Sequence, residues 1–500
     1  MLFSSMIFLW VFLPTVIIIN FLLTLVPFES QRTRIAWKNF FLLCASFFFY
    51  AWGGIYYLLI MISSILLNYA GGYIIEKAAK SRLAKRIWLA VIIVLNLAIL
   101  FFFKYFNMLI AIIESLMIPG AGFSEIWSTM ISMEGTGALG LSQIVLPIGI
   151  SFFTFQAMSY VMDVYLGKAR LQENVFDFAL YVSLFPQLIA GPIVQYADVD
   201  LQIRDRRETL DLFASGIKRF CYGLGKKVLI SNVVAEIADG VWAMETSSLG
   251  AFAAWVGLIS YTLQIYYDFS GYSDMAIGIG RMLGFEFKEN FDYPYTSLSV
   301  SEFWRRWHIS LGSWFREYIY IPLGGNRHGL LRTCFNIFVV YAVTGIWHGA
   351  NFTFIAWGMF YAVLQIMEKL FLGKLLQKNP YKIVNWIYTM AAVMLGWIYF
   401  RSNTIFQANE YLRQLFNFGV MNNRIFEYLS VTALVVIGFG ILFSGFVQRP
   451  LKGLWGKLHS KPAISYPVLA VDYLLQMVIL VLSFGKLVGG TYNAFIYFQF

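Results

Sequence analysis

Long apolar runs, separated by short polar segments, follow one another along most of the chain. Several of them approach the roughly 20 apolar residues that a helix needs to cross the hydrocarbon core of a bilayer. They are continuous and lack the apolar/polar alternation of barrel strands, so they predict helices. We therefore expect an all-α polytopic membrane protein with about 10–12 spanning helices. The predicted spans lie at about 1–26, 39–51, 55–75, 88–113, 144–165, 228–245, 250–270, 333–347, 350–372, 384–401, 427–447 and 464–487.

Three further segments have patterns that do not suit a plain spanning helix. Residues 176–196 are apolar but contain two prolines and a glycine close together. Such breaks are tolerated at membrane depth only where protein buries them or where they line a cavity, so we predict a broken or re-entrant helix. Basic side chains among apolar ones predict an interfacial amphipathic helix at 211–227. Residues 281–332 mix charges with aromatics, and we expect them in or under the inner leaflet.

The charge pattern predicts how the chain is oriented. Hydrophobic residues make up 59% of the sequence and charged residues 13%, about half the charged share of soluble domains. Basic residues gather in short segments such as 29–38 and 76–87, whereas 114–143 contains neither Lys nor Arg. Short basic loops are typically cytoplasmic, so the third segment is predicted to lie outside. The net charge of +10 therefore fits a protein among membrane lipids, and we expect no nucleic-acid partner.

Several kinds of chemistry lack their sequence signature. The three cysteines lie far apart, which favours neither a disulfide framework nor a metal site. The chain has no His-Glu-x-x-His metal motif, no Gly-x-Ser-x-Gly elbow and no phosphate-binding loop of the ATPase type. We expect no metal, no bound cofactor and no use of ATP.

Three of the four histidines fall within residues 301–350. His348 lies in an almost unbroken apolar run, where an ionisable side chain predicts a functional site; the alternative is a structural histidine bonded to a carbonyl. Gly349, directly after it, predicts a tight turn that a ligand can approach. His308 follows Trp-Arg-Arg-Trp, which is also typical of a helix anchored at lipid headgroups. The other two histidines are expected to be solvated loop residues: His328 and His459.

Polar residues are concentrated in the stretch 266–274. It holds two carboxylates, two hydroxyls and three phenols between apolar runs. These side chains predict either the lining of a cavity or the caps of a helix start, because Ser and Asp are preferred N-caps. The candidates are Asp268, Ser270 and Asp274.

Long motifs resemble the membrane-bound O-acyltransferase family, in its alginate O-acetyltransferase-like branch. The strongest are YDFSGYSDMAIG from Tyr267, EFWRRWHISL from Glu302 and GIWHGAN from Gly345. Further matches begin at Leu146, Leu188, Tyr318 and Gly396. The resemblance implies one integral-membrane domain over 1–500, built as a helical bundle around a central funnel. Its core motifs lie at about 144–372 and its peripheral helices at 1–113 and 384–487.

The same resemblance implies a function and assigns roles to residues. His348 matches the family's near-invariant histidine and His308 its second polar position. His348 is then the expected general base, and acetyl-CoA or another acyl thioester is the expected donor substrate. A basic surface at 204–227 and 281–332 suits an anionic donor. Candidates for lining the funnel or positioning the donor are Asp268, Ser270, Asp274, Trp304, Arg305, Trp307 and Asn351.

The expected product is an O-acetylated extracytoplasmic polysaccharide, an alginate-like exopolysaccharide or cell-wall glycan. We expect an extracytoplasmic acetyltransferase as partner and a bacterial cytoplasmic membrane as location. Tyr497, near the aromatic end of the chain, is a candidate acyl relay; an interfacial anchor is the alternative. Alternatives for the whole protein are D-alanyl transfer to teichoic acid and a polysaccharide or lipid transporter, since broken helices also mark transporters.

Overall fold

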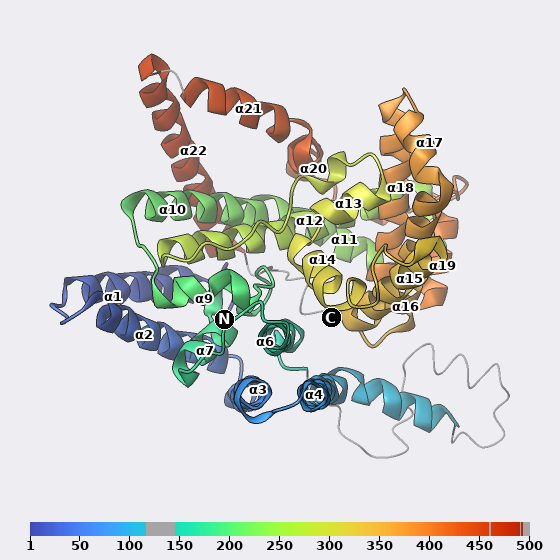
Figure 1. Ribbon diagram of the computed structural model, residues 1–500. Helices are drawn as coiled ribbons and strands as arrows, with labels where there is room; N and C mark the ends of the chain where they lie inside the picture. Colours follow the sequence, from blue (N-terminus) through green and yellow to red (C-terminus); the bar gives the residue numbers. More distant parts are fainter. Residues whose placement is uncertain (117–145, 460–461, 491, 494–500) are drawn as a thin grey trace.

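The computed structural model describes residues 1–116, 146–459, 462–490 and 492–493 (Figure 1). Within these ranges the chain is helical and contains no strand, which confirms the predicted all-α class. The first helices are α1 Leu13–Leu25, α2 Gln31–Ala51, α3 Ile55–Tyr73, α4 Arg82–Leu116, α6 Ile150–Tyr165, α7 Val175–Ser183, α8 Phe185–Leu188, α9 Tyr196–Arg204, α10 Leu210–Gly225 and α11 Asn232–Trp242. They are followed by α12 Gly250–Met282, α13 Val300–Arg306, α14 Ile309–Phe315, α15 Gly329–His348, α16 Phe352–Met367, α17 Gly373–Lys378, α18 Lys382–Arg401, α19 Ile405–Gln414, α20 Val431–Ile441, α21 Gln448–His459 and α22 Pro462–Gly489.

Seven helical segments of the described chain are long and apolar enough to cross a membrane. They are Phe8–Leu25, Ile55–Ala78, Arg82–Ile110, Gly329–His348, Phe352–Lys378, Lys382–Arg401 and Tyr466–Gly489. Helices also form at the predicted spans near 39–51, 144–165 and 250–270, but these helices are shorter or carry more polar residues. The protein is a multi-pass membrane protein.

The predicted break within 176–196 is present in the structure. Helix α7 ends at Ser183, the single turn α8 ends at Leu188, and helix resumes only at Tyr196. Protein buries this interruption, and nearby side chains bond to its freed carbonyl groups. Tyr181 Oη donates to the Val194 carbonyl over 2.8 Å, and Gln187 Nε2 donates to the Tyr181 carbonyl over 2.6 Å. The interruption is tolerated because protein surrounds these backbone groups.

A helix forms where the sequence predicts an interfacial one, at 211–227, and it packs against other helices. Helix α10 lies along α12 and continues through the π-helical turn Lys226–Ser231 into α11. The two helices touch at pairs of glycines, where a Cβ on Gly216 would lie 2.6 Å from the Gly278 carbonyl oxygen and one on Gly223 would lie 2.7 Å from that of Gly271. Small residues at such crossings let membrane helices approach closely.

Three basic residues of α10 and the turn after it pair with carboxylates of α12. Lys226 Nζ lies 2.6 Å from Asp274, Arg219 lies 2.6 Å from the same carboxylate, and Lys227 Nζ lies 2.7 Å from Asp268. These three cations therefore do not form the docking surface that the sequence predicted for an anionic donor. Their positive charges neutralise the two carboxylates of α12, which would otherwise lie unpaired in a largely apolar interior.

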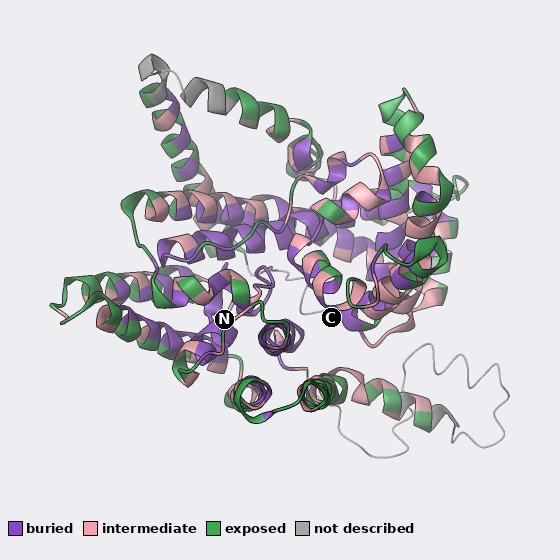
Figure 2. Cartoon of the chain, in the orientation of Figure 1, coloured by how far each residue is buried: buried purple, intermediate pink, exposed green. Residues whose placement is uncertain are grey.

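Helix α12 organises the fold around the site. It runs through the middle of the molecule, with α1–α3 on one side and α15–α18 on the other (Figure 1). Nearly all of its residues are buried (Figure 2), and it contributes to three of the four hydrophobic clusters. Its buried position explains why the stretch 266–274 could not be recognised as a helix from amphipathic periodicity.

Candidate active site

His348 is the last residue of α15 and lies at a tight junction with α16. The connection has three residues, and Asn351 ends it by accepting a hydrogen bond from the Thr353 amide over 3.1 Å, which caps α16. A Cβ at Gly349 would lie 2.3 Å from the Phe354 ring, so only glycine allows this close approach. The tight turn predicted after His348 is therefore present.

The His348 ring is buried among aromatic side chains. Its centroid lies 4.9 Å from those of Trp347 and Trp357 and 5.1 Å from that of Phe400. No hydrogen bond joins this ring to the described part of the chain. The alternative of a structural histidine bonded to a carbonyl therefore finds no support within those residues.

His308 lies between two short helices, α13 and α14, in a left-handed backbone conformation with φ +46° and ψ +54°. Few non-glycine residues adopt this conformation. The ring is buried, with Phe269 packed edge-on at 4.6 Å and Phe152 stacked at 6.4 Å. Trp307 is also buried, within an aromatic cluster that includes Trp397. The interpretation of this segment as a headgroup anchor is therefore wrong for Trp307 and His308.

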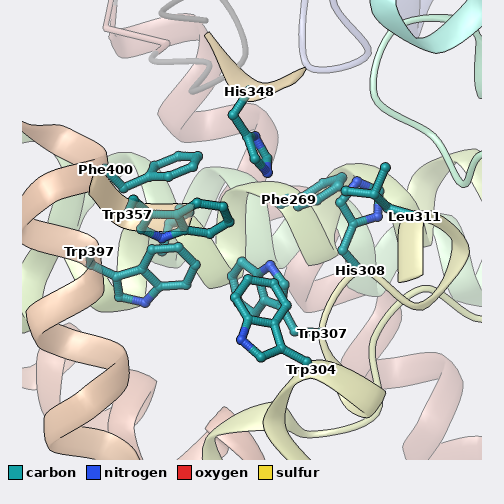
Figure 3. Close-up of a pocket in the computed structure, with 10 residues that line it drawn as sticks. Phe269, Trp304, Trp307, His308, Leu311, His348, Trp357, Trp397 and Phe400 are labelled. Carbon is teal, nitrogen blue, oxygen red and sulfur yellow. The ribbon is translucent and has the colours of Figure 1, made fainter. Parts of the chain in front are cut away.

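Both histidines line one small cavity of about 20 Å³, roughly the space of one water molecule. Figure 3 shows the two rings on different sides of this space, with indole rings completing the wall. Six helices and the His308 loop contribute, so the site depends on many parts of the bundle. The lining residues are Ile265, Phe269, Trp304, Trp307, His308, Leu311, His348, Trp357, Trp397 and Phe400.

Burial determines the charge of His308. Burial of the ring lowers the pKa of His308 to about 3, because burial disfavours the charged imidazolium. Protonation would require a pH well below the physiological range, so His308 is neutral at pH 7. A neutral imidazole has one nitrogen that donates and one that accepts a hydrogen bond.

The sequence analysis missed Lys104, a lysine within the spanning helix α4. Its ammonium donates to the carbonyl oxygen of Trp347, the residue before His348, and lies 5.5 Å from the centre of the Trp347 ring. It also lies 3.4 Å from the Ser151 hydroxyl. Next to it on α4, Tyr105 donates to the Ile346 carbonyl. These contacts tie α4 to the last turn of α15. A lysine inside an apolar span was itself a signal for function.

Replacing Lys104 by Met is expected to slow the reaction about 10- to 100-fold. A hydrogen bond from a charged group contributes about 1.5–3 kcal/mol to stability. Without this bond, the last turn of α15, which carries His348, is held less firmly in place. The matched control is Lys85→Met on the same helix, because Lys85 is half-buried near the helix start, away from His348, and pairs with Glu76 at 3.5 Å. Initial rates of acyl transfer measure both variants. Equal rates for Lys104→Met and the wild type would exclude a role for this contact.

The structure brings only some of the predicted residues to the cavity. Trp304, Trp307, His308 and His348 line it. Asp268 and Asp274 lie in mid-helix and pair with the cations described above, so they neither line this cavity nor cap a helix start. The remaining predicted residues also lie away from it: Ser270 is buried within α12, Arg305 is exposed, and Asn351 caps α16.

Tyr497 lies outside the described residues. His328 is exposed, as predicted for a loop histidine. The described residues contain no group of three or more His, Cys, Asp or Glu side chains placed to hold a metal ion.

Comparison with known proteins identifies the family. A sequence model of the membrane-bound O-acyltransferase family matches residues 172–408. The chain is 37% identical over 520 residues to the probable alginate O-acetylase AlgI of Pseudomonas putida, covering 100% of both chains. The chain belongs to the membrane-bound O-acyltransferase family. It is an O-acyltransferase, which confirms the family resemblance of its motifs and sets aside the transporter alternative.

Two other relatives of this O-acyltransferase show how similarity varies with acyl group and acceptor. The peptidoglycan O-acetyltransferase of Helicobacter pylori is 33% identical over 443 residues, covering 83% of this chain and 79% of the relative. The teichoic acid D-alanyltransferase of Bacillus subtilis is 26% identical over 236 residues, covering 45% and 59%. Similarity to the acetyl-transferring relatives extends over more of the chain than similarity to the D-alanyl-transferring one.

Proposed function

We propose that this protein moves an acetyl group from a cytoplasmic thioester, with acetyl-CoA as the expected donor, to a hydroxyl group of an extracytoplasmic polysaccharide. The single observation that supports this reaction best is the convergence of His308 and His348 on one aromatic-walled cavity. The acetyl group is favoured over D-alanine because the O-acetylase relative aligns over the full chain and the D-alanyltransferase over less than half of it. A bacterial cytoplasmic membrane is the corresponding location.

In the proposed reaction, His348 acts as general base. Its ring takes the proton of the acceptor hydroxyl while the hydroxyl oxygen attacks the thioester carbonyl carbon. The new C–O bond gives the ester, the C–S bond breaks, and the thiolate leaves with the proton that His348 held. Such proton transfer contributes about 10²–10⁴-fold to a rate. His308, on another side of the cavity, orients the reacting groups.

The aromatic wall suits this chemistry. Tryptophan and phenylalanine rings make up most of the cavity wall; such a wall limits the access of water to a bound thioester, which protects it from hydrolysis and strengthens electrostatic effects on the reacting atoms. Tyr497 remains a predicted acyl relay to an extracytoplasmic acetyltransferase partner. A relay by a tyrosine would proceed through a covalent ester on the phenol oxygen.

A donor comparison tests the proposed function. Purified protein in nanodiscs is incubated with labelled acetyl-CoA, and in parallel with a D-alanyl thioester on a carrier protein. We measure thiol release and label appearing in an added polysaccharide. Acetyl transfer without D-alanyl transfer is expected. Transfer of D-alanine alone would replace the proposed acyl group while leaving the O-acyltransferase assignment intact.

A further inference from the structure

The loop that carries His308 is paired, through its backbone, with residues 290–292. The Ile309 amide donates to the Asn290 carbonyl over 3.0 Å, and the Asp292 amide donates to the Arg306 carbonyl over 2.9 Å. These bonds flank His308 and hold it in its left-handed conformation. Non-glycine residues in such conformations persist only where surrounding structure over-determines them. Segment 290–292 therefore fixes the position of the His308 ring.

The hydrogen-bond partners of the Asn290 side chain determine which of its amide atoms is the oxygen and which is the nitrogen. The Ser310 amide donates to Asn290 Oδ1 over 3.2 Å, and since a backbone N–H only donates, this atom must be the oxygen. The Ser310 hydroxyl accepts from the Ile193 amide over 2.9 Å and donates to the same oxygen over 2.9 Å. On the other side, Asn290 Nδ2 donates to the Ser273 hydroxyl over 3.2 Å. The amide oxygen thus faces His308.

This orientation decides which nitrogen of His308 carries the proton. His308 Nδ1 lies 3.2 Å from Asn290 Oδ1, and an amide oxygen can only accept a hydrogen bond. Nδ1 is therefore protonated in the neutral ring, and Nε2 has a free lone pair. Nε2 has no hydrogen-bond partner among the described residues, although the ring lines the cavity.

We propose that Asn290 is a positioning residue that fixes the His308 tautomer with the proton on Nδ1, so that Nε2 is a hydrogen-bond acceptor in the cavity. An accepting nitrogen cannot polarise a thioester carbonyl, but it can hold a hydroxyl group. This inference rests on the proposed function and makes it more specific. His308 Nε2 accepts a hydrogen bond from a second hydroxyl group of the polysaccharide acceptor rather than contacting the acyl donor, and His348 takes the proton of the hydroxyl that attacks the thioester.

The side chains that face His308 determine how a negative charge at position 290 would change the pKa of His308. From α12, α6 and α14 the facing side chains are uncharged, namely Phe269, Phe152 and Ser310. The titratable group near the ring, within the described chain, is His348 on α15. A carboxylate placed at position 290 would therefore be the one negative charge in contact with His308.

Nitrogen NMR of histidine-labelled protein in nanodiscs tests the tautomer without any assay of activity. The chain has four histidines, and the spectrum of His308→Gln assigns the His308 signals. We expect an unprotonated Nε2 in the wild type and in Asn290→Asp, and a changed pattern in Asn290→Leu. A protonated Nε2 in the wild type would overturn the inference.

The pH dependence of acetyl transfer gives a second test. In Asn290→Asp the carboxylate still accepts from Nδ1–H, but it raises the pKa of His308 by about 1–3 pH units. Protonated His308 cannot accept a hydrogen bond. Activity relative to the wild type should therefore fall about twofold to tenfold between pH 8 and pH 5, because a rise of about 2 to 3 units leaves His308 half to nine-tenths protonated at pH 5.

The control is Asn336→Asp. Asn336 is also fully buried and donates to the Gly325 carbonyl over 2.9 Å, but it does not line the cavity. Its pH profile should run parallel to that of the wild type. A parallel profile for Asn290→Asp as well would overturn the positioning role. If the wild type transfers no acyl group from any donor, the proposed function fails, and the NMR result still decides the tautomer.

Discussion

Replacement of His348 by Ala is expected to lower the rate of acetyl transfer at least about 100-fold, because general acid–base catalysis contributes a factor of about 10² or more to a rate. His348 is the last residue of α15, and its ring is surrounded by Trp347, Trp357 and Phe400 rather than by hydrogen-bond partners. Because no described side chain depends on the ring for a hydrogen bond, the variant should fold. Initial rates with labelled acetyl-CoA measure the effect.

His328→Ala is the matched control for this experiment. His328 precedes the same helix, α15, at its opposite end, and its side chain is exposed. We expect a rate within about twofold of the wild type, since surface substitutions away from special features usually change stability by less than about 0.5 kcal/mol. A His348→Ala protein that keeps more than about a tenth of the wild-type rate would argue against proton transfer by His348.

The second large effect is expected from Lys227→Met. The Lys227 ammonium lies 2.7 Å from Asp268, and both side chains are almost completely buried, with 2% and 1% exposed. Removing one partner leaves a charge in the interior, which costs about 3–5 kcal/mol. The melting temperature of the purified protein in detergent should therefore fall. In Lys227→Met/Asp268→Asn the uncompensated charge is gone, and we expect part of the loss to be recovered.

An exposed ion pair gives the comparison for Lys227→Met. Lys288 lies 2.6 Å from Asp198, but 70% of the Lys288 side chain is exposed. Surface ion pairs contribute about 0–1 kcal/mol, so Lys288→Met should leave the melting temperature nearly unchanged. If the two single variants melted at the same temperature, burial would not be what makes the Lys227–Asp268 pair important.

Features that depend on residues close together in the sequence could be predicted from the sequence. Length and continuity of apolar runs predicted the helical class, and two prolines with a glycine predicted the broken helix that ends α7 at Ser183. A histidine in an apolar run pointed to His348, which lines the cavity; its catalytic role stays a prediction. These signals need no knowledge of how distant segments pack.

Pairings between distant segments could not be predicted from local signals. Asp268 and Asp274 looked like cavity residues because a run of polar side chains does not say which helix face each one occupies. Asp268 pairs with Lys227, which lies some 40 positions away on the chain. Asn290 was missed for a similar reason: only the folded loop brings it to His308. Trp357 and Trp397 carry no local sign of lining the cavity, since apolar runs surround both.

The most direct test of the account compares acetyl-transfer rates of the wild type, His308→Ala, His348→Ala and the double variant under identical conditions in nanodiscs. Two residues that act as one unit give strongly non-additive effects. We predict that each single variant is impaired and that the double variant is within about threefold of the slower single one. A wild-type rate in either single variant, or a double variant slowed by the full product of the two single effects, would contradict a shared site.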